Sequence, residues 1–252
     1  MAEQFEELNR RKIALLIDGD NAQPSLIKKM LAETGKIGSI TIRRIYGDWT
    51  TPNMNGWKET LTDNAIQPIQ QFRNTIGKNA TDSAMIIDAM EILYSGHVEG
   101  FSIVSSDSDY TRLATKIREK GLFVMGIGKQ QTPQAFVKAC DRFIFTEILI
   151  SEDSSQKDKT MDTSILKTVD KQKMIEAIQL MKQAFEMAVG DDGWAHLGAV
   201  GNNLRELNPG FDPRTYGYKQ LSQLFIACPK LFELKHYKES TVFYVKLKEL
   251  NL

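Results

Sequence analysis

Two short acidic runs, each placed directly after an apolar stretch, are the residues of this chain best suited to chemistry. Ile13–Ile17 leads into Asp18–Asn21, and Phe101–Val104 leads into Ser105–Asp109. An apolar run of this length, ended by Gly, Asn or Ser, is typical of a buried parallel strand. Ligands of open α/β sheets bind where the strands end, so carboxylates from the two runs can converge at one edge. Carboxylate oxygens suit Mg²⁺ or Mn²⁺, which indicates metal-assisted phosphate chemistry.

A third polar segment, Lys78–Asp82, opens a helical pattern and places Asp82 in its first turn. Carboxylates that lie this close raise one another's pKa, and a bound divalent cation offsets that repulsion. The cation also lowers the pKa of a bound water, which gives a nucleophile at neutral pH. Asn21, Ser105 and Ser106 can hold such a water or a substrate oxygen, and Lys78 can contact a phosphate.

A structural role is the alternative for each of these aspartates alone. An Asp after a strand is often a turn residue or a helix cap, and Asp109 is placed to cap the helical segment that follows it. Asp88 comes six residues after Asp82 and so faces away from it on the same helix. We expect Asp88 to pair with another residue.

Alternating strand-like and helix-like segments predict how these residues are positioned. The order predicts an α/β domain with a parallel sheet between two layers of helices. The predicted strands are Ile13–Ile17, Ser39–Tyr46, Ala65–Gln70, Phe101–Ser105, Leu122–Ile127 and Phe143–Phe145, and the predicted helices are Ser25–Glu33, Trp57–Asp63, Thr81–Tyr94, Asp109–Lys120 and Pro133–Ala139.

Bulk composition narrows the class of protein. The chain has 252 residues and 32 Lys+Arg against 32 Asp+Glu, which excludes a strongly basic coat. Cys140 and Cys228 have no metal-type spacing, so we expect a reducing, cytoplasmic setting. Met1–Gln4 is polar and unlike a secretory signal, and no apolar run approaches the roughly 20 residues of a membrane helix.

The pattern changes after residue 150, which predicts a linker over 151–170 and a second domain over 171–252. Polar residues and helix breakers without periodicity fill Ser151–Asp170. Beyond it, Met174–Phe185, Trp194–Leu207 and Tyr218–Ala227 have helical patterns. The segments Leu231–Leu234 and Thr241–Leu247 then alternate as a hairpin does, with Lys235–Ser240 at its tip. Three helices followed by a hairpin are the element order of a winged helix.

The acidic segments resemble the motifs of NYN domains, which belong to the PIN-like nuclease superfamily. Ile17–Asn21, Lys78–Asp82 and Ser105–Tyr110 occur in the family's order within Lys12–Leu149. The resemblance implies an endoribonuclease fold with a Mg²⁺ or Mn²⁺ site. PIN-like domains often pair, so a homodimer is a further expectation. The resemblance assigns the metal ligands to Asp18, Asp82, Asp107 and Asp109 and adds Asn21 as a site residue.

The second domain resembles an OST-HTH/LOTUS domain through Asp192–Leu204 and Phe211–Leu221. That resemblance covers roughly 173–248 and implies binding of RNA or of a protein partner. Arg214, Tyr218 and Lys219 combine positive charge with an aromatic face, as phosphate and base-stacking contacts require, and are predicted to bind substrate.

The sequence thus predicts a metal-dependent endoribonuclease with a module that recruits RNA or a partner. One alternative is a haloacid dehalogenase-like phosphatase with Asp18 as nucleophile and Asp20 as acid–base, although no lysine before Asp107 is well placed for it. The other is a regulatory adaptor that binds RNA or protein without catalysis.

Overall fold

The chain divides into two compact units, and the division falls between Asp153 and Ser154. The computed structural model describes residues 11–72, 80–154, 171–236 and 242–248. The first unit has a hydrophobic core on each face of its sheet and the second unit has a core of its own, so each unit is described by itself.

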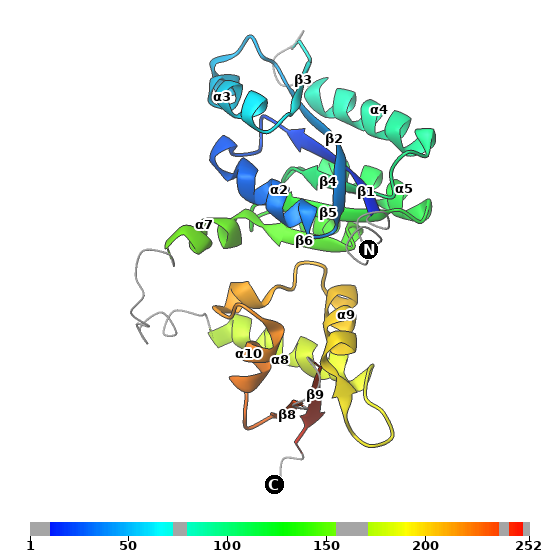
Figure 1. The fold of residues 1–252 in the computed structure, drawn as a ribbon, viewed down its shortest axis with the longest axis vertical. Helices are drawn as coiled ribbons and strands as arrows, with labels where there is room; N and C mark the ends of the chain where they lie inside the picture. The colour runs from blue at the N-terminus through cyan, green and yellow to red at the C-terminus, as the bar shows by residue number, and fades with distance from the viewer. Residues whose placement is uncertain (1–10, 73–79, 155–170, 237–241, 249–252) are drawn as a thin grey trace, which may run out of the picture. The chain divides into compact units, whose positions relative to one another are not determined.

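The first unit is built on a six-stranded parallel sheet (Figure 1). Its strand order is β3-β2-β1-β4-β5-β6, so the chain runs outward from β1 to β3 and then returns to the other side of β1. The carboxyl ends of β1 and β4 therefore lie at the point where the strand order reverses, which is where open α/β sheets bind ligands. The strands are β1 (Arg11–Asp18), β2 (Gly38–Gly47), β3 (Gln67–Gln70), β4 (Gly100–Val104), β5 (Phe123–Gly128) and β6 (Arg142–Phe145).

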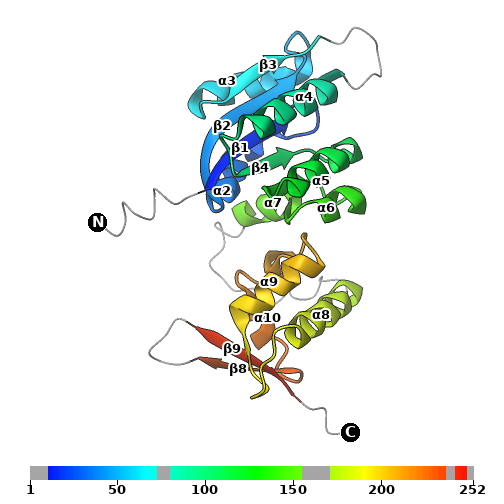
Figure 2. The same cartoon turned by 90° about the vertical axis from the view of Figure 1, so that its right-hand side faces the viewer.

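Helices cover both faces of this sheet (Figure 2). Successive side chains of a strand point to opposite faces, so β1 contributes Leu16 to one core and Leu15 to the other. Met85 of α4 packs in the first core, and Met30 of α2 packs in the second. The first face is covered by α4 (Ala80–Ser95), α5 (Thr111–Glu119) and α6 (Gln134–Ala139), and the second by α2 (Ile27–Gly35), α3 (Asn55–Asp63) and α7 (Thr146–Ser154).

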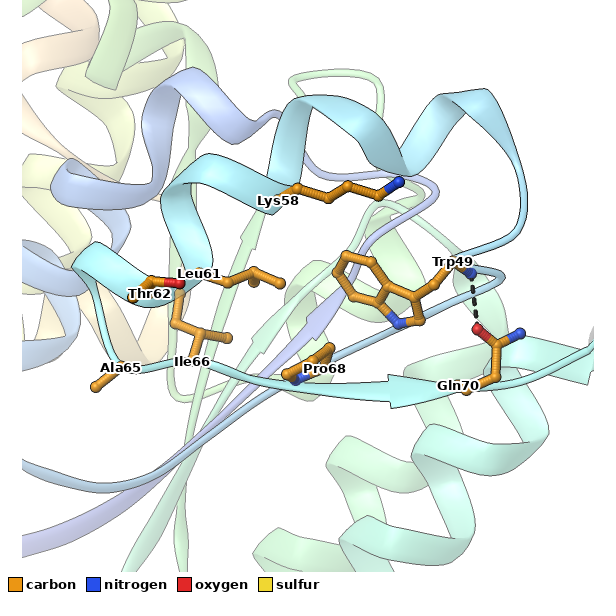
Figure 3. Close-up of a pocket in the computed structure, with 8 residues that line it drawn as sticks. All are labelled: Trp49, Lys58, Leu61, Thr62, Ala65, Ile66, Pro68 and Gln70. Atoms are coloured by element: carbon orange, nitrogen blue, oxygen red, sulfur yellow. Dashed lines mark hydrogen bonds between the residues drawn. The ribbon is translucent and has the colours of Figure 1, made fainter.

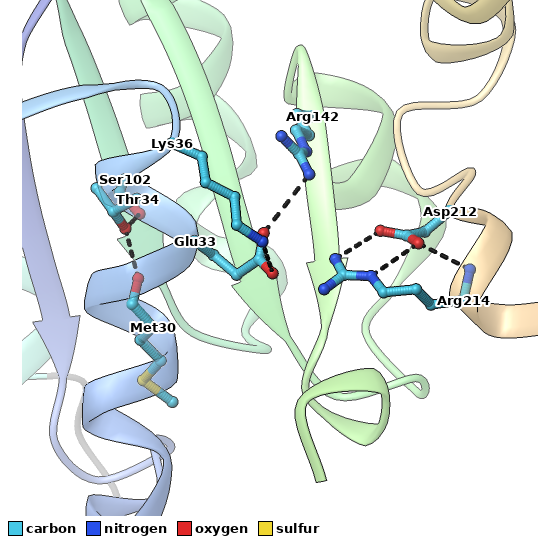
Figure 4. Close-up of polar contacts among 8 residues, drawn as sticks. All are labelled: Met30, Glu33, Thr34, Lys36, Ser102, Arg142, Asp212 and Arg214. Carbon is cyan, nitrogen blue, oxygen red and sulfur yellow. Dashed lines mark hydrogen bonds and ion pairs between the residues drawn. The ribbon is translucent and has the colours of Figure 1, made fainter. Parts of the chain in front are cut away.

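A buried carboxylate fastens α2 to the edge of the sheet (Figure 4). Glu33 is only 2% exposed and pairs with Lys36 at 2.8 Å and with Arg142 of β6 at 3.5 Å. Beside it, the hydroxyls of Thr34 and Ser102 lie 3.1 Å apart and join α2 to β4. A buried charge without partners costs several kcal/mol, so these contacts fix the position of α2.

Within its described residues, the second unit contains three α-helices and a small antiparallel sheet of order β7-β9-β8. Its core includes Met181, Val200, Leu224 and Val245, one from each helix and one from the sheet. The elements are α8 (Lys171–Glu186), β7 (Ala195–His196), α9 (Leu197–Leu207), the 3₁₀ turn η5 (Pro213–Tyr216), α10 (Leu221–Ile226), β8 (Phe232–His236) and β9 (Phe243–Leu247).

Most predicted elements are present, with ends shifted by a few residues, but some predicted boundaries are wrong. Trp194–His196 does not begin a helix, because Ala195 and His196 pair with β9 and the helix starts at Leu197. The predicted linker overlaps α7, which continues to Ser154. Lys235 and His236, predicted at the hairpin tip, belong to β8, and residues 237–240 of the tip lie outside the described residues. Across the part of the chain that the structure describes, no helix is long and apolar enough to cross a bilayer.

Candidate metal centre

The two acidic runs emerge side by side because β1 and β4 are hydrogen-bonded neighbours. Ile17 of β1 is in register with Val104 of β4, so Asp18 and Ser105 follow at the same edge of the sheet. The first turn of α4, which carries Asp82, reaches this edge through the contacts of α4 with β1 and with the turn η3 (Ser108–Tyr110).

Three carboxylates form the centre of the cluster. Asp82, Asp107 and Asp109 each offer an oxygen within 4.8 Å of the others, with Asp82 and Asp107 half-buried and Asp109 exposed. Asp107 also caps η3, since its Oδ1 accepts a hydrogen bond of 2.9 Å from the backbone N–H of Asp109. The same cap therefore fixes the spacing of two of the three acids.

Asp18 lies beside these three and is fully buried. Its Oδ2 accepts hydrogen bonds from Asn21 Nδ2 at 2.6 Å and from Ser105 Oγ at 2.8 Å. Burial raises the pKa of Asp18, the hydrogen bonds from Asn21 and Ser105 lower it, and the charges of Asp82 and Asp20 raise it further. The net effect is a raised pKa, so this carboxylate would be more stable with a positive charge nearby.

The pKa of Asp82 is raised as well, for similar reasons. Tyr110 Oη donates a hydrogen bond of 2.7 Å to Asp82 Oδ1. Partial burial raises the pKa of Asp82, the Tyr110 hydrogen bond lowers it, and the charges of Asp107, Asp109 and Asp20 raise it. Burial and the nearby acids raise the pKa of Tyr110 as well, so its hydroxyl stays protonated and remains a donor.

This donor set fits a hard divalent cation. Mg²⁺ and Mn²⁺ prefer carboxylate oxygens, and Asp82, Asp107 and Asp109 bring theirs within ligand distance of one another. The raised pKa values of Asp18 and Asp82 reflect burial and mutual repulsion, which a cation would relieve. A metal at this edge would be held by these three residues with Asp18 adjacent.

Two residues of the acidic runs, Asp20 and Tyr110, help to build the site although the sequence predicted no role for them in it. Asp20 adds a negative charge that acts on both Asp18 and Asp82, and its Oδ2 accepts a hydrogen bond of 3.3 Å from Thr81. Tyr110 holds Asp82 from a fully buried position. Tyr110 ends the segment Ser105–Tyr110, but nothing in its residue type or spacing predicted its contact with Asp82, 28 positions earlier in the chain.

Other predicted residues have structural contacts. Ser106 Oγ accepts a hydrogen bond of 2.8 Å from the backbone N–H of Lys129 and thereby holds the loop after β5. Lys78 lies outside the described residues. Asp88 pairs, as expected, and receives hydrogen bonds of 2.9 Å from both Arg44 and Tyr46.

The residues predicted to bind substrate in the second unit differ in exposure. The guanidinium of Arg214 makes two hydrogen bonds to Asp212, of 3.0 and 2.7 Å, and its side chain is only 16% exposed (Figure 4). Tyr218 is half-buried and Lys219 is exposed. Their role in binding stays a prediction.

A separate groove of about 560 Å³ lies between α3 and β3 (Figure 3). Trp49 forms part of its wall, and its indole N–H donates to the carbonyl of Ile69 at 3.0 Å. The groove is lined by side chains other than those of the acidic cluster, so it is separate from the candidate metal centre. Its lining residues are Trp49, Lys58, Leu61, Thr62, Ala65, Ile66, Pro68 and Gln70.

Comparison with known proteins identifies the family of each domain. The family model of the NYN domain matches residues 12–152, and that of the OST-HTH/LOTUS domain matches residues 163–243. An uncharacterized protein of Methanocaldococcus jannaschii is 27% identical over 186 residues, which are 67% of this chain and 71% of that protein.

Two solved structures are also similar. A protein of unknown function from Vibrio parahaemolyticus matches 53% of this chain and 91% of its own, with 18% identity and a TM-score of 0.44. An uncharacterized protein from Nitrosomonas europaea matches 29% of this chain and 74% of its own, with 38% identity and a TM-score of 0.27. The family matches decide the assignment: the chain belongs to the NYN domain family, within the PIN-like nucleases, and carries an OST-HTH/LOTUS domain after its NYN domain.

Proposed function

We propose that the first unit is an endoribonuclease that hydrolyses RNA phosphodiester bonds with a bound Mg²⁺ or Mn²⁺. The observation that carries this proposal is the set of three carboxylates, Asp82, Asp107 and Asp109, gathered within 4.8 Å at the switch point of the sheet. Membership of a PIN-like nuclease family supports the reaction class. The OST-HTH/LOTUS domain supports RNA binding by the second unit, where RNA or a protein partner would be recruited.

Each residue of the site has a distinct task in this proposal. Asp82, Asp107 and Asp109 hold the cation, which supplies Lewis acidity and a water of lowered pKa. Asp109 is the exposed member of the set and so faces the side from which substrate arrives. Asn21 commits its amide nitrogen to Asp18, so its carbonyl oxygen is the group that can orient the attacking water.

Asp18 is a positioning and electrostatic residue in this scheme. Ser105 Oγ donates to Asp18 and also accepts the backbone N–H of Asp107 at 3.1 Å. This chain of hydrogen bonds couples the end of β1 to the loop that carries two of the metal ligands. A phosphatase with Asp18 as nucleophile is disfavoured, because this carboxylate is fully buried and one oxygen already has two donors.

The test is cleavage of a mixture of single-stranded and structured RNA with Mn²⁺, Mg²⁺ or EDTA. Asp107→Asn keeps an oxygen that can cap η3 but removes a ligand charge, and Asp18→Asn removes the buried charge. Asp63→Asn, at the exposed end of α3, is the matched control.

The proposal predicts metal-dependent cleavage by the wild type and by Asp63→Asn. Asp107→Asn should lose about 100-fold or more because it removes a metal ligand, and Asp18→Asn should lose about 10- to 100-fold, the range for partners of metal ligands. Equal cleavage by all four proteins, or none by any, would contradict the nuclease and favour an adaptor that binds RNA or protein without catalysis.

A further inference from the structure

The small sheet of the second unit has one buried face and one solvent face. Residues directly opposite each other in an antiparallel pair share a face, and residues two apart along a strand share it too. Phe232, Leu234 and Val245 point into the core. The register of β8, β9 and β7 then places His196, Glu233, Lys235, Tyr244 and Lys246 on the other face. The ring of Trp194, two residues before His196, lies near the ammonium groups of Lys235 and Lys246 on that face. We refer to these six residues as the sheet face.

Aromatic rings and ammonium groups alternate on the sheet face. The Nζ atoms of Lys235 and Lys246 lie 5.7 and 6.0 Å from the ring centroid of Trp194. The rings of His196 and Tyr244 meet edge to face, with centroids 5.6 Å apart. Lys235, Lys246 and His196 are exposed, whereas Trp194 and Tyr244 are half-buried and thus held in place.

We propose that the sheet face binds single-stranded RNA, with bases stacked on Trp194 and Tyr244 and phosphates bound by Lys235 and Lys246. Unpaired bases need an aromatic plane, and the backbone beside them needs positive charge. Both are present on one rigid surface, because the opposite face of the same strands is packed in the core. This inference rests on the proposed function only in taking RNA as the ligand of the chain.

Two other ligands fit the sheet face less well. An acidic peptide would pair with Lys235 and Lys246 but would leave the ring of Trp194 without a role. A duplex keeps its bases stacked inside, so it offers no base to the aromatic rings. Glu233 stands opposite Lys246 in the register and adds a negative charge to the face. Its carboxylate should repel the backbone of a bound strand.

The test measures affinity of the full chain for a mixed-sequence single-stranded RNA by fluorescence anisotropy in EDTA. Binding without metal separates this inference from the proposed cleavage, which can fail while binding persists. The variants are Trp194→Leu, the double variant Lys235→Glu/Lys246→Glu, and Glu233→Gln. Lys219→Glu tests the rival site at Arg214, Tyr218 and Lys219. Lys173→Glu, a charge reversal at an exposed lysine of α8, is the matched control.

Trp194→Leu should lower the affinity about 5- to 100-fold, the range for loss of one base–aromatic stack. The double variant should bind at least 10-fold more weakly, and its plot of log affinity against log salt should be flatter by about 1.4, since each single-strand phosphate contact contributes about 0.7. Glu233→Gln should bind about 2- to 3-fold more tightly through removal of one like charge. This gain cannot come from a folding defect.

The proposal is overturned if Lys219→Glu weakens binding while the sheet-face variants bind as the wild type does. That result would place the RNA near the predicted residues Arg214, Tyr218 and Lys219. It is equally overturned if a duplex RNA or a polyglutamate peptide competes as well as the single strand. A direct check is the indole N–H signal of Trp194 in an NMR titration, which should shift with RNA while that of the buried Trp57 stays fixed.

Discussion

Tyr110 and Tyr46 are two buried phenols that each donate a hydrogen bond to an aspartate, but only Tyr110 contacts a predicted metal ligand. Tyr110 donates to Asp82 at 2.7 Å, and Tyr46 donates to Asp88 at 2.9 Å. Tyr110→Phe and Tyr46→Phe should each cost about 1 kcal/mol of unfolding free energy. Only Tyr110→Phe should weaken Mn²⁺ binding, by about 10-fold or more, because it releases the orientation of Asp82. Calorimetric titration of both variants with Mn²⁺ measures the two affinities, and equal affinities would refute this role of Tyr110.

The pKa of Asp82 predicts how stability without metal depends on pH. In the folded chain this pKa is raised above its ordinary value of 3.8, so the folded state binds the proton more tightly than the unfolded state. The free energy of unfolding therefore falls as the pH rises from about 4 through the raised pKa. Asp82→Asn keeps an oxygen that can accept the hydrogen bond from Tyr110, and it removes the titrating group that causes this fall in unfolding free energy.

In EDTA, Asp82→Asn should be more stable than the wild type at pH 7 to 8, by up to about 1 kcal/mol after allowance for solvent screening. The difference should vanish toward pH 4. Thermal unfolding across this pH range measures the difference in unfolding free energy between the two proteins. A difference that is constant, or that widens toward acid, would show that the neighbours of Asp82 do not raise its pKa.

Among the elements, the C-terminal ends of α3 and α4 should respond to substitution with opposite changes in the free energy of unfolding. Ala65 follows α3 with φ of 50°, a left-handed conformation that costs a residue with a side chain, and Ile66 N–H closes the helix on the carbonyl of Leu61 at 3.0 Å. Gly96 takes the same conformation after α4, with φ of 69°. Ala65→Gly should raise the unfolding free energy by about 0.5 to 1 kcal/mol, and Gly96→Ala should lower it by about 1 kcal/mol. Denaturant titrations of both variants decide the point, and the same sign for both would contradict it.

The elements also show what the sequence could predict. The runs Ile13–Ile17 and Phe101–Val104 predicted β1 and β4 because buried parallel strands are continuously apolar. Trp194–His196 could not be assigned from its own pattern, since β7 is two residues long and is defined by its pairing with β9, which is distant in sequence. The helical pattern that follows at Leu197 extended the predicted helix too far toward its start.

In the site too, the sequence predicted local features but not contacts between distant segments. Strand ends predicted where Asp18 and Asp107 would emerge, because parallel strands share one carboxyl edge. The contact of Tyr110 with Asp82 depends on how α4 packs against η3, which no local pattern encodes. Likewise, the residue types around Arg214 predicted that its guanidinium contacts phosphate, but they could not predict that it pairs with Asp212.

At the scale of the whole molecule, two units with separate cores should fold and act separately. A chain ending at Ser154 retains both cores of the NYN domain and all the carboxylates of the cluster. It should bind Mn²⁺ as the full chain does and bind single-stranded RNA more weakly. Residues 155–252 alone should fold, as judged by dispersed NMR signals, and bind RNA in EDTA. Loss of Mn²⁺ binding on truncation would show that the metal centre needs the second unit.

Everything proposed for the first unit depends on a divalent cation held by the aspartates at the carboxyl edge of the sheet. An equilibrium titration of Mn²⁺ followed by electron paramagnetic resonance, on wild type, Asp107→Asn and Asp63→Asn, measures that binding. Wild type and Asp63→Asn should bind Mn²⁺ alike, and Asp107→Asn should bind at least about 10-fold more weakly. Identical titrations for all three proteins, or no binding by the wild type, would contradict the proposed cation site.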